Sequence, residues 1–243
     1  MHANLAAICD AVSDRLIDLT LPLRPGTRGI DFEMSKTIDE DGWNARTLHL
    51  YSHAGTHMDA ATHFFHSDEI VDGRPAKEHS IDRVPIANLF SPAWIVNVPG
   101  LAPKSEIHIA HLGEIADRFV VGESLLFRTG WSAHWEDPEI YRDGLPRIAE
   151  DLATWMVEHR VRLLGVEPPS VADVNDLEEV TRIHRILLGG GVTIVEGLTN
   201  LEAIHSPRVL FAALPLKIEG GDGCPCRAFA IEWDLESESE AAS

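Results

Sequence analysis

The apolar positions of the chain fall into short runs separated by polar and turn-forming residues. Runs of this length predict buried strands, which we expect at 16–21, 47–52, 93–98, 124–128, 161–166, 192–196, 209–214 and 227–233. Other segments carry apolar residues at helical spacing and predict helices over 4–15, 148–159 and 176–188. Gly189–Gly191 directly follow the last of these and are typical of a helix end. Short strands interspersed with a few helices predict a mixed α/β fold.

No internal repeat and no linker-like stretch divides the sequence. We therefore expect a single domain over residues 1–235, followed by an acidic, disordered tail at Glu236–Ser243. A chain of 243 residues is long enough to bury a core without disulfides or structural zinc.

Charge excludes several classes of partner. Lys and Arg number 20 against 39 Asp and Glu, a formal net charge of −19, which repels nucleic acid and anionic lipid. No stretch approaches the ~20 apolar residues that a membrane helix needs, and the first residues lack a signal-peptide pattern. The odd cysteine count, with Cys224 and Cys226 too close for an ordinary bridge, favours a reducing compartment. We expect a cytoplasmic protein that binds neither nucleic acid nor membrane. We expect these two cysteines to pack near a Gly-rich turn; a thiol metal site or a redox pair is the alternative.

Histidine is the unusual residue, with 13 in the chain. His53, His57, Asp59 and His63 have the same parity and would share one face of an extended chain. A straight strand would hold His53 and His57 ~13 Å apart, whereas ligands of one metal each lie ~2.0–2.2 Å from it. The backbone must therefore fold back at Gly55-Thr56. Imidazole and carboxylate without thiolate suit Zn²⁺ or Mn²⁺ in a catalytic site; the alternative is a set of scattered surface or core histidines.

A second candidate pair lies further along the chain. His184 is on the apolar stripe of the helix expected at 176–188, and Glu196 is on the apolar face of the strand that follows. An ionised Glu at such a position is costly unless it is paired or bound to metal. His184 could instead be a satisfied core histidine, and Glu196 could reach solvent at the strand end. The helix–glycine–strand reversal could add both to the first cluster, but the spacing leaves this open.

The sequence resembles the metal-dependent "cyclase" family, which includes bacterial kynurenine formamidase and isatin hydrolase. The matching segments are His53–Phe64, Leu126–Trp131, His184 with Glu196–Leu201, and Leu214–Gly223 with Arg227-Ala228. The resemblance implies a swivelling β/β/α fold and a metal-dependent amidohydrolase that cleaves a small aromatic amide or formamide with a metal-activated water. It also implies a homodimer or homotetramer.

The same resemblance implies a role for each matching residue. His53, His57 and Asp59 match metal ligands, and His184 and Glu196 match the ligands of a second metal. Glu196 can alternatively act as an acid or base in members with one metal. The cofactor is then a divalent ion, Zn or Mn, as one or two ions. His63 matches a histidine just outside the metal shell that shuttles protons.

Departures from the family pattern leave the substrate open. Formamidases usually have Pro at the position of Ala61, an aromatic-Pro-Gly-Asp turn in place of Arg24–Thr27, a shorter 29–46 segment, and Asp at Glu167. The substrate could be a formamide or an isatin-like cyclic amide. A hydrolase or dehydratase that acts on another cyclic or polyketide-like substrate is also open. A non-catalytic metal or ligand binder is the alternative from another class. The absence of a Gly-x-Ser-x-Gly motif disfavours a serine hydrolase.

Tryptophan supplies the candidates for an aromatic substrate pocket. Trp43 and Trp131 are the substrate-binding residues we expect, with Trp135 as a further candidate. Tryptophan is equally common as a half-buried packing residue, so both interpretations stand.

Overall fold

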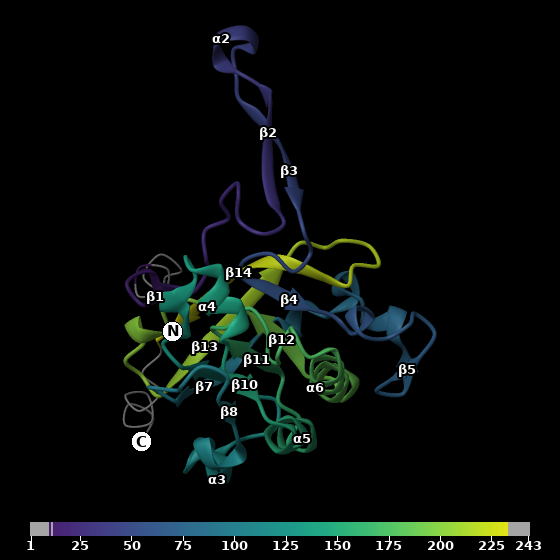
Figure 1. Ribbon diagram of the computed structural model, residues 1–243, viewed down its shortest axis with the longest axis vertical. Helices are drawn as coiled ribbons and strands as arrows, with labels where there is room; N and C mark the ends of the chain where they lie inside the picture. Colours follow the sequence, from purple (N-terminus) through teal and green to yellow (C-terminus); the bar gives the residue numbers. More distant parts are fainter. Residues whose placement is uncertain (1–9, 11, 233–243) are drawn as a thin grey trace, which may run out of the picture.

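Seven of the eight expected strands lie in one eight-stranded sheet, whose remaining strand comes from the histidine-rich segment; seven strands of this sheet close into a ring (Figure 1). This computed structural model describes Asp10 and residues 12–232. The ring runs β14-β13-β7-β9-β11-β12-β4 and back to β14, while β1 pairs with the C-terminal part of β14. The eight strands of the sheet are β1 (Leu16–Asp18), β4 (His57–Asp59), β7 (Phe90–Asn97), β9 (Ser124–Arg128), β11 (Leu163–Val166), β12 (Thr193–Glu196), β13 (Arg208–Pro215) and β14 (Gly223–Ile231). The fold is a mixed α/β single domain, as the sequence predicts, and the structure adds that its main sheet is barrel-like.

Four neighbouring strands of the ring, β7, β9, β11 and β12, run parallel and form the centre of the core. Side chains alternate between the two faces of a strand. Leu125 and Phe127 therefore pack in the outer core, under α5 (Glu150–Glu158) and α6 (Leu177–Gly189), whereas Leu126 packs in the core inside the ring. Burial on both faces explains why these strands read as continuous apolar runs rather than as alternating patterns.

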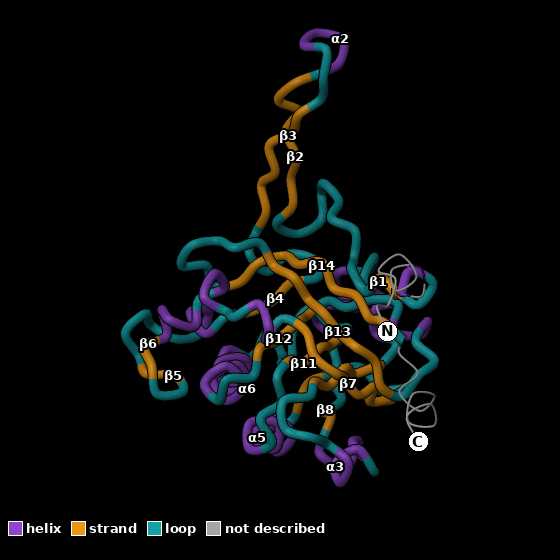
Figure 2. Tube along the Cα trace, turned by 180° about the vertical axis from the view of Figure 1, so that it is seen from behind, coloured by secondary structure: helices purple, strands orange, loops and turns teal. Residues whose placement is uncertain are grey.

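A two-stranded arm projects far from this body (Figures 1 and 2). Strand β2 (Ile30–Lys36) pairs antiparallel with β3 (Ala45–Leu50), and α2 (Ile38–Asp41) lies at the tip. The strand expected at 47–52 forms as β3, but it belongs to this arm and not to the main sheet. Apolar and polar residues alternate along β3, but β3 pairs only with β2 and most of its residues are exposed. The alternation therefore does not mark a face that packs on the core.

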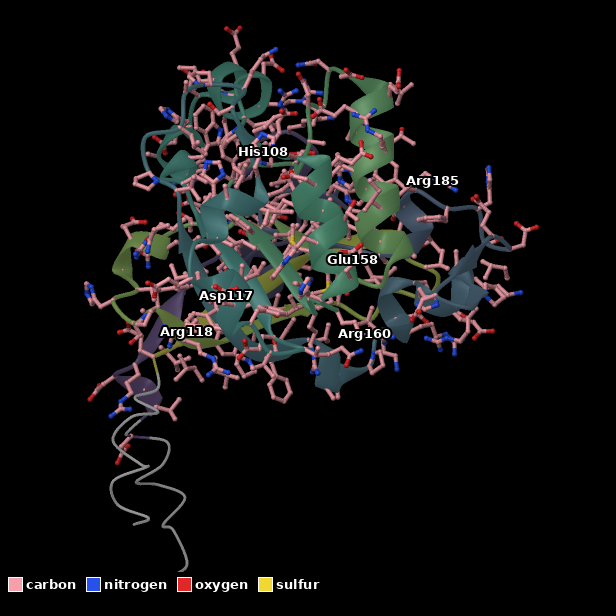
Figure 3. All side chains as sticks on the ribbon, turned by 90° about the horizontal axis from the view of Figure 1, so that it is seen from below. His108, Asp117, Arg118, Glu158, Arg160 and Arg185 are labelled. Atoms are coloured by element: carbon pink, nitrogen blue, oxygen red, sulfur yellow. The ribbon has the colours of Figure 1, made fainter. Side chains whose placement is uncertain are left out.

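Short elements connect the main strands. They are β5 (Ile70–Val71), β6 (Arg74–Pro75), β8 (Glu106–Ile107), β10 (Arg147–Ile148), α3 (Ile115–Arg118) and α4 (Pro138–Asp143). Arg185 on α6 attaches the segment that leads to β5, because its guanidinium donates to the Phe64 carbonyl at 2.8 Å and to Glu69 at 2.7 Å (Figure 3). This fixes α6 against the residues that follow the histidine-rich segment.

Several local predictions are confirmed. Helices α5 and α6 match the segments 148–159 and 176–188, and α6 ends in the glycine run. Cys224 and Cys226 are buried in the core inside the ring. Most of the helix expected at 4–15 and all of the tail at 236–243 lie outside the described residues. Within the described ranges the longest helix, α6, has 13 residues, and no helix is long and apolar enough to cross a membrane.

Candidate metal centre

The histidine-rich segment folds back where its glycine permits it. Gly55 has a φ of +61°, in the left-handed region, and the chain turns there between His53 and the start of β4. The Thr56 hydroxyl holds the turn by donating to the Gly197 carbonyl at 2.6 Å and accepting from the Leu21 amide at 2.8 Å. The fold-back predicted from ligand spacing is therefore present at the predicted position.

Sheet pairing brings the second cluster to the first. Strand β4 pairs with β12 so that His57 lies opposite Glu196 and Asp59 lies opposite Ile194. On its other edge β4 pairs with the start of β14, where Gly223 lies opposite Asp59. Strand β4, which carries His57 and Asp59, thus lies between β12, which carries Glu196, and the start of β14.

Two histidines present the same nitrogen to the centre. His57 Nε2 lies 3.2 Å from Glu196 Oε2 and 3.5 Å from Asp59 Oδ1. His184 Nε2 lies 3.4 Å from Glu196 Oε1 and 3.6 Å from Asp59 Oδ2. The opposite nitrogens, Nδ1, lie 2.9 Å from the Gly55 carbonyl and 2.7 Å from the Val180 carbonyl. Because a carbonyl oxygen only accepts, each Nδ1 carries the hydrogen and leaves Nε2 free to be a ligand.

His53 lies between two carboxylates. Its Nδ1 is 2.8 Å from Asp59 Oδ1, and its Nε2 is 2.9 Å from Asp222 Oδ2. His63, at the end of the 3₁₀ turn Ala61–His63, stacks on the His53 ring with 3.7 Å between centroids, and its Nδ1 lies 3.9 Å from Asp222 Oδ2. Sequence reasoning missed Asp222, although it lies inside the segment Leu214–Gly223 that carries part of the resemblance.

The donor set fits a divalent cation. Asp59 and Glu196 are both buried, and Asp59 Oδ2 has no hydrogen-bond partner among the described residues. Three sets of side chains have candidate ligand atoms within 4.8 Å of one another: His53, His57 and Asp59; Asp59, His184 and Glu196; and His53, His63 and Asp222. Buried carboxylates are costly unless they are paired or ligate a metal. The cluster therefore offers nitrogen and oxygen atoms of the kind that ligate a divalent metal ion.

Protonation in the cluster is coupled to metal binding. Burial opposes charge on Asp59, but the hydrogen bond from His53 and the nearby His57 outweigh it and lower the pKa of Asp59. Burial likewise opposes charge on His53, but Asp59 and Asp222 outweigh it and raise the pKa of His53 to about 9. A cation that takes these nitrogens as ligands must displace their protons, so binding releases protons.

A cavity of about 190 Å³ opens onto the cluster, lined by His57, His63, Phe64, His184 and Glu196 among others. A second, mainly apolar cavity of about 150 Å³ adjoins it and shares Arg28, His53, Arg142 and Pro169 with the first. Both together provide a metal-facing space and an apolar extension.

Neither of the two expected substrate-binding tryptophans lines these two cavities. Trp43 lies at the end of the arm and is 57% exposed. Trp131 is 5% exposed and packs against Leu21 and Leu145, with its Nε1 donating to the Tyr141 carbonyl at 2.9 Å. Trp135 does line the apolar cavity. Trp131 is a packing residue behind this wall, because its only polar atom already has a backbone partner.

Glu167 is also buried, but unlike Asp59 it accepts hydrogen bonds at both of its carboxylate oxygens. Its oxygens accept from the Thr129 amide and hydroxyl at 2.7 Å, the Trp131 amide at 3.1 Å and the Ser132 hydroxyl at 3.0 Å. With four donors it needs no cation. It fixes the loop that follows β9.

Comparison with known proteins identifies the family and the fold of this chain. The Cyclase family model, described as "Putative cyclase", matches residues 17–173. Kynurenine formamidase of Bacillus cereus (strain ZK / E33L) is 31% identical over 221 residues, 87% of this chain and 95% of that protein. Kynurenine formamidase of Erythrobacter litoralis (strain HTCC2594) is 32% identical over 215 residues, 87% of this chain and 88% of that protein. Isatin hydrolase A from Labrenzia aggregata, solved with benzyl benzoate, has the same fold with a TM-score of 0.83 at 21% identity, over 95% of this chain and 99% of that one.

Proposed function

The chain belongs to the Cyclase family, and on this premise we propose that it is a metal-dependent amidohydrolase that cleaves a small aromatic amide or formamide. The observation that carries the proposal is the buried cluster in which His57 and His184 direct Nε2 toward Asp59 and Glu196. A site of this kind, open to a cavity, is typical of a catalytic metal rather than a structural one.

His53, His57, Asp59, His184 and Glu196 would hold one or two divalent ions, Zn or Mn. Asp59 belongs to two of the candidate ligand sets, so it would be shared if two ions bind. When bound, such an ion acts as a Lewis acid that acidifies water and polarises a carbonyl oxygen.

The remaining chemistry is proton transfer. Hydrolysis forms a C–O bond from water, breaks the C–N bond and requires a proton on the departing nitrogen, giving a carboxylic acid and an amine. His63 lines the cavity beside the ligands and is 25% exposed, so it can carry this proton. Glu196 is less suited to that task, because its Oε1 accepts from the Val171 amide at 2.8 Å and its Oε2 faces His57. We therefore assign Glu196 as a metal ligand and His63 as the group that carries the proton to the departing nitrogen.

The proposal is tested by metal content and turnover together. Purified protein is analysed for Zn and Mn, then assayed with N-formylkynurenine and isatin before chelation, after chelation and after return of each metal. We expect bound metal, turnover of at least one substrate, and loss on chelation with recovery by one metal. Full activity after exhaustive chelation would contradict the metal role.

The alternatives give different results in the same assay. A hydrolase or dehydratase for another cyclic or polyketide-like substrate would bind metal but convert neither N-formylkynurenine nor isatin. It would act only on its own substrate when a wider panel of compounds is tested. A non-catalytic binder would hold metal stoichiometrically and convert nothing. The position of His63 in the cavity wall favours an enzyme, because a binder needs no proton carrier.

We also propose that the chain acts on a small-molecule amide in the cytoplasm as a homodimer or homotetramer. Support for the oligomer comes from the arm, where Met34, Ile38, Trp43 and Leu48 are 46–61% exposed. A two-stranded ribbon is marginally stable on its own, and large exposed apolar groups favour a protein partner. Light scattering on a sizing column tests the proposal, and a monomer at micromolar concentration would contradict it.

A further inference from the structure

The three candidate ligand histidines are anchored to the rest of the protein in two different ways. His57 and His184 each have Nδ1 beside a neutral backbone carbonyl. His53 is held differently, because its Nε2 lies 2.9 Å from Oδ2 of the Asp222 carboxylate while its Nδ1 faces Asp59 at 2.8 Å. One of the three histidines is therefore anchored by a charged side chain, and that side chain is not among the expected metal ligands.

Asp222 is itself fixed in the residue before β14. Its backbone carbonyl accepts from the Ala60 amide at 2.9 Å, just beyond the end of β4, and the Ser52 hydroxyl donates to its Oδ2 at 3.2 Å. The next residue, Gly223, makes room for the imidazole, because a Cβ there would lie 2.6 Å from His53 Cε1. The pair Asp222-Gly223 therefore provides both the acceptor for His53 and the space that its ring occupies.

The same carboxylate oxygen faces the residue assigned to proton transfer. Asp222 Oδ2 lies 3.9 Å from His63 Nδ1, which is an electrostatic contact and too long for a hydrogen bond. His53 and His63 both line the metal-facing cavity, whereas Asp222 lines neither that cavity nor the apolar one. An effect of Asp222 on the reaction must therefore act through the two histidines.

We propose that Asp222 is a positioning residue, whose carboxylate holds the Nε2 hydrogen of His53 and so presents Nδ1 to a divalent ion beside Asp59. The inference rests on the proposed function, which supplies the ion. An imidazole that binds a metal through one nitrogen donates the hydrogen on its other nitrogen to an acceptor, which fixes the ring and makes it a better ligand. Hydrogen bonds to a carboxylate are stronger than those to a neutral carbonyl, so His53 is held more firmly than His57 and His184.

Metal affinity tests the proposal without any substrate. Metal-free wild type, Asp222→Ala and Asp222→Asn are titrated with Zn²⁺ and with Mn²⁺ in competition with a chromophoric chelator. We expect Asp222→Ala to raise the Kd of the ion roughly 10- to 100-fold, as is typical when the acceptor behind a ligand histidine is lost. Asp222→Asn should recover most of this loss, because its amide oxygen still accepts from Nε2. Equal losses in the two variants would overturn the positioning role, because they would make the carboxylate itself a ligand.

Asp82→Asn is the matched control. Asp82 holds the same loop from its other side, where it accepts from the Gly220 amide at 3.0 Å and the Ser80 hydroxyl at 2.7 Å, and it lines neither the metal-facing nor the apolar cavity. We expect its Kd for the ion to match that of wild type. A rise as large as that of Asp222→Ala would overturn the proposal, because a loosened loop would then explain both results.

Kinetics at saturating metal separate positioning from substrate binding. With N-formylkynurenine or isatin, whichever the enzyme converts, Asp222→Ala should lower kcat and leave KM unchanged, because Asp222 does not line the cavities. A raised KM with kcat unchanged would instead place Asp222 in substrate binding and overturn the proposal.

The two readouts also distinguish this inference from the proposed function. Weaker metal binding by Asp222→Ala, in a protein that hydrolyses neither compound, would support the positioning role and count against the proposed function alone. An active hydrolase whose metal affinity does not depend on Asp222 would overturn the positioning role and leave the hydrolase intact. Wild type that binds neither ion would contradict both.

Discussion

The metal centre and the β2–β3 arm depart from the usual burial rules in opposite directions. In the centre, Asp59 and Glu196 are charged groups enclosed by the sheet, and one Asp59 oxygen has no hydrogen-bond partner in the described residues. On the arm, four large apolar side chains face solvent on a ribbon of two strands. Buried charge and exposed apolar surface both cost free energy when nothing compensates them.

The comparison indicates that different kinds of partner would compensate the two regions. The centre requires positive charge in a small space, which a divalent cation supplies. On the arm, a second copy of the chain would cover the exposed apolar side chains, as proposed above. Substitutions should therefore separate the two: those in the centre should act on rate and metal, and those on the arm should act on assembly.

The largest effect is expected from Asp59→Asn. This change removes the carboxylate shared by two candidate ligand sets, so we expect loss of bound metal and a fall in kcat beyond the ~10²–10⁴-fold typical of a lost proton-transfer group. Metal analysis and steady-state kinetics measure both quantities. Metal-free Asp59→Asn should unfold at a lower temperature than metal-free wild type, because it removes the carboxylate whose charge His53 and His57 stabilise. Retention of full metal content would show that Asp59 is not a ligand.

A smaller loss of rate is expected from His63→Ala. His63 stacks on His53 but is assigned to proton transfer, so we expect metal content to stay within error of wild type while kcat falls ~10²–10⁴-fold. His53→Ala is the comparison, because it should lower metal content as well. Normal turnover by His63→Ala would show that the proton takes another route.

Local chemistry explains which parts of this centre could be predicted from sequence. The fold-back at Gly55 follows from ligand distances alone, since a straight strand cannot place His53 and His57 on one ion. Strands β9 and β12 could be predicted because each is a short apolar run, and such a run is visible in the sequence without knowledge of its partner strands.

Long-range pairing explains what could not be predicted. Glu196 reaches His57 because β12 lies beside β4 in one particular register, and Asp222 arrives because β14 pairs with the other edge of β4. Neither register is encoded within either strand. The direction of the arm is likewise set by its junction with the body, so the sequence around Trp43 does not say whether that indole faces its own cavity or solvent.

Glu167→Gln sharpens the contrast between two buried carboxylates. Glu167 accepts four hydrogen bonds, so replacement of one oxygen by an amide nitrogen sets donor against donor and removes a charge that these bonds stabilise. We expect unfolding in urea to show a loss of about 2–4 kcal/mol, from the usual ~1.5–3 kcal/mol of a hydrogen bond to a charged group and the desolvation of an unpaired one. The loss should be the same with and without metal. A loss that disappears when metal is removed would place Glu167 in the metal network.

The smallest effect on folding is expected from Trp43→Ser on the arm. Trp43 is 57% exposed and makes no contact that the core depends on, so the free energy of unfolding of the monomer should change by less than ~0.5 kcal/mol. The same variant should weaken self-association, which light scattering across a concentration series measures. Ile86→Ser is the matched control, because Ile86 is an apolar residue that is 76% exposed in the 3₁₀ turn Ile86–Asn88, outside the arm. If both variants leave association unchanged, the apolar surface of the arm is not the contact between copies. If Trp43→Ser instead lowers the stability of an isolated monomer, the indole packs within its own chain and the contrast between the two regions fails.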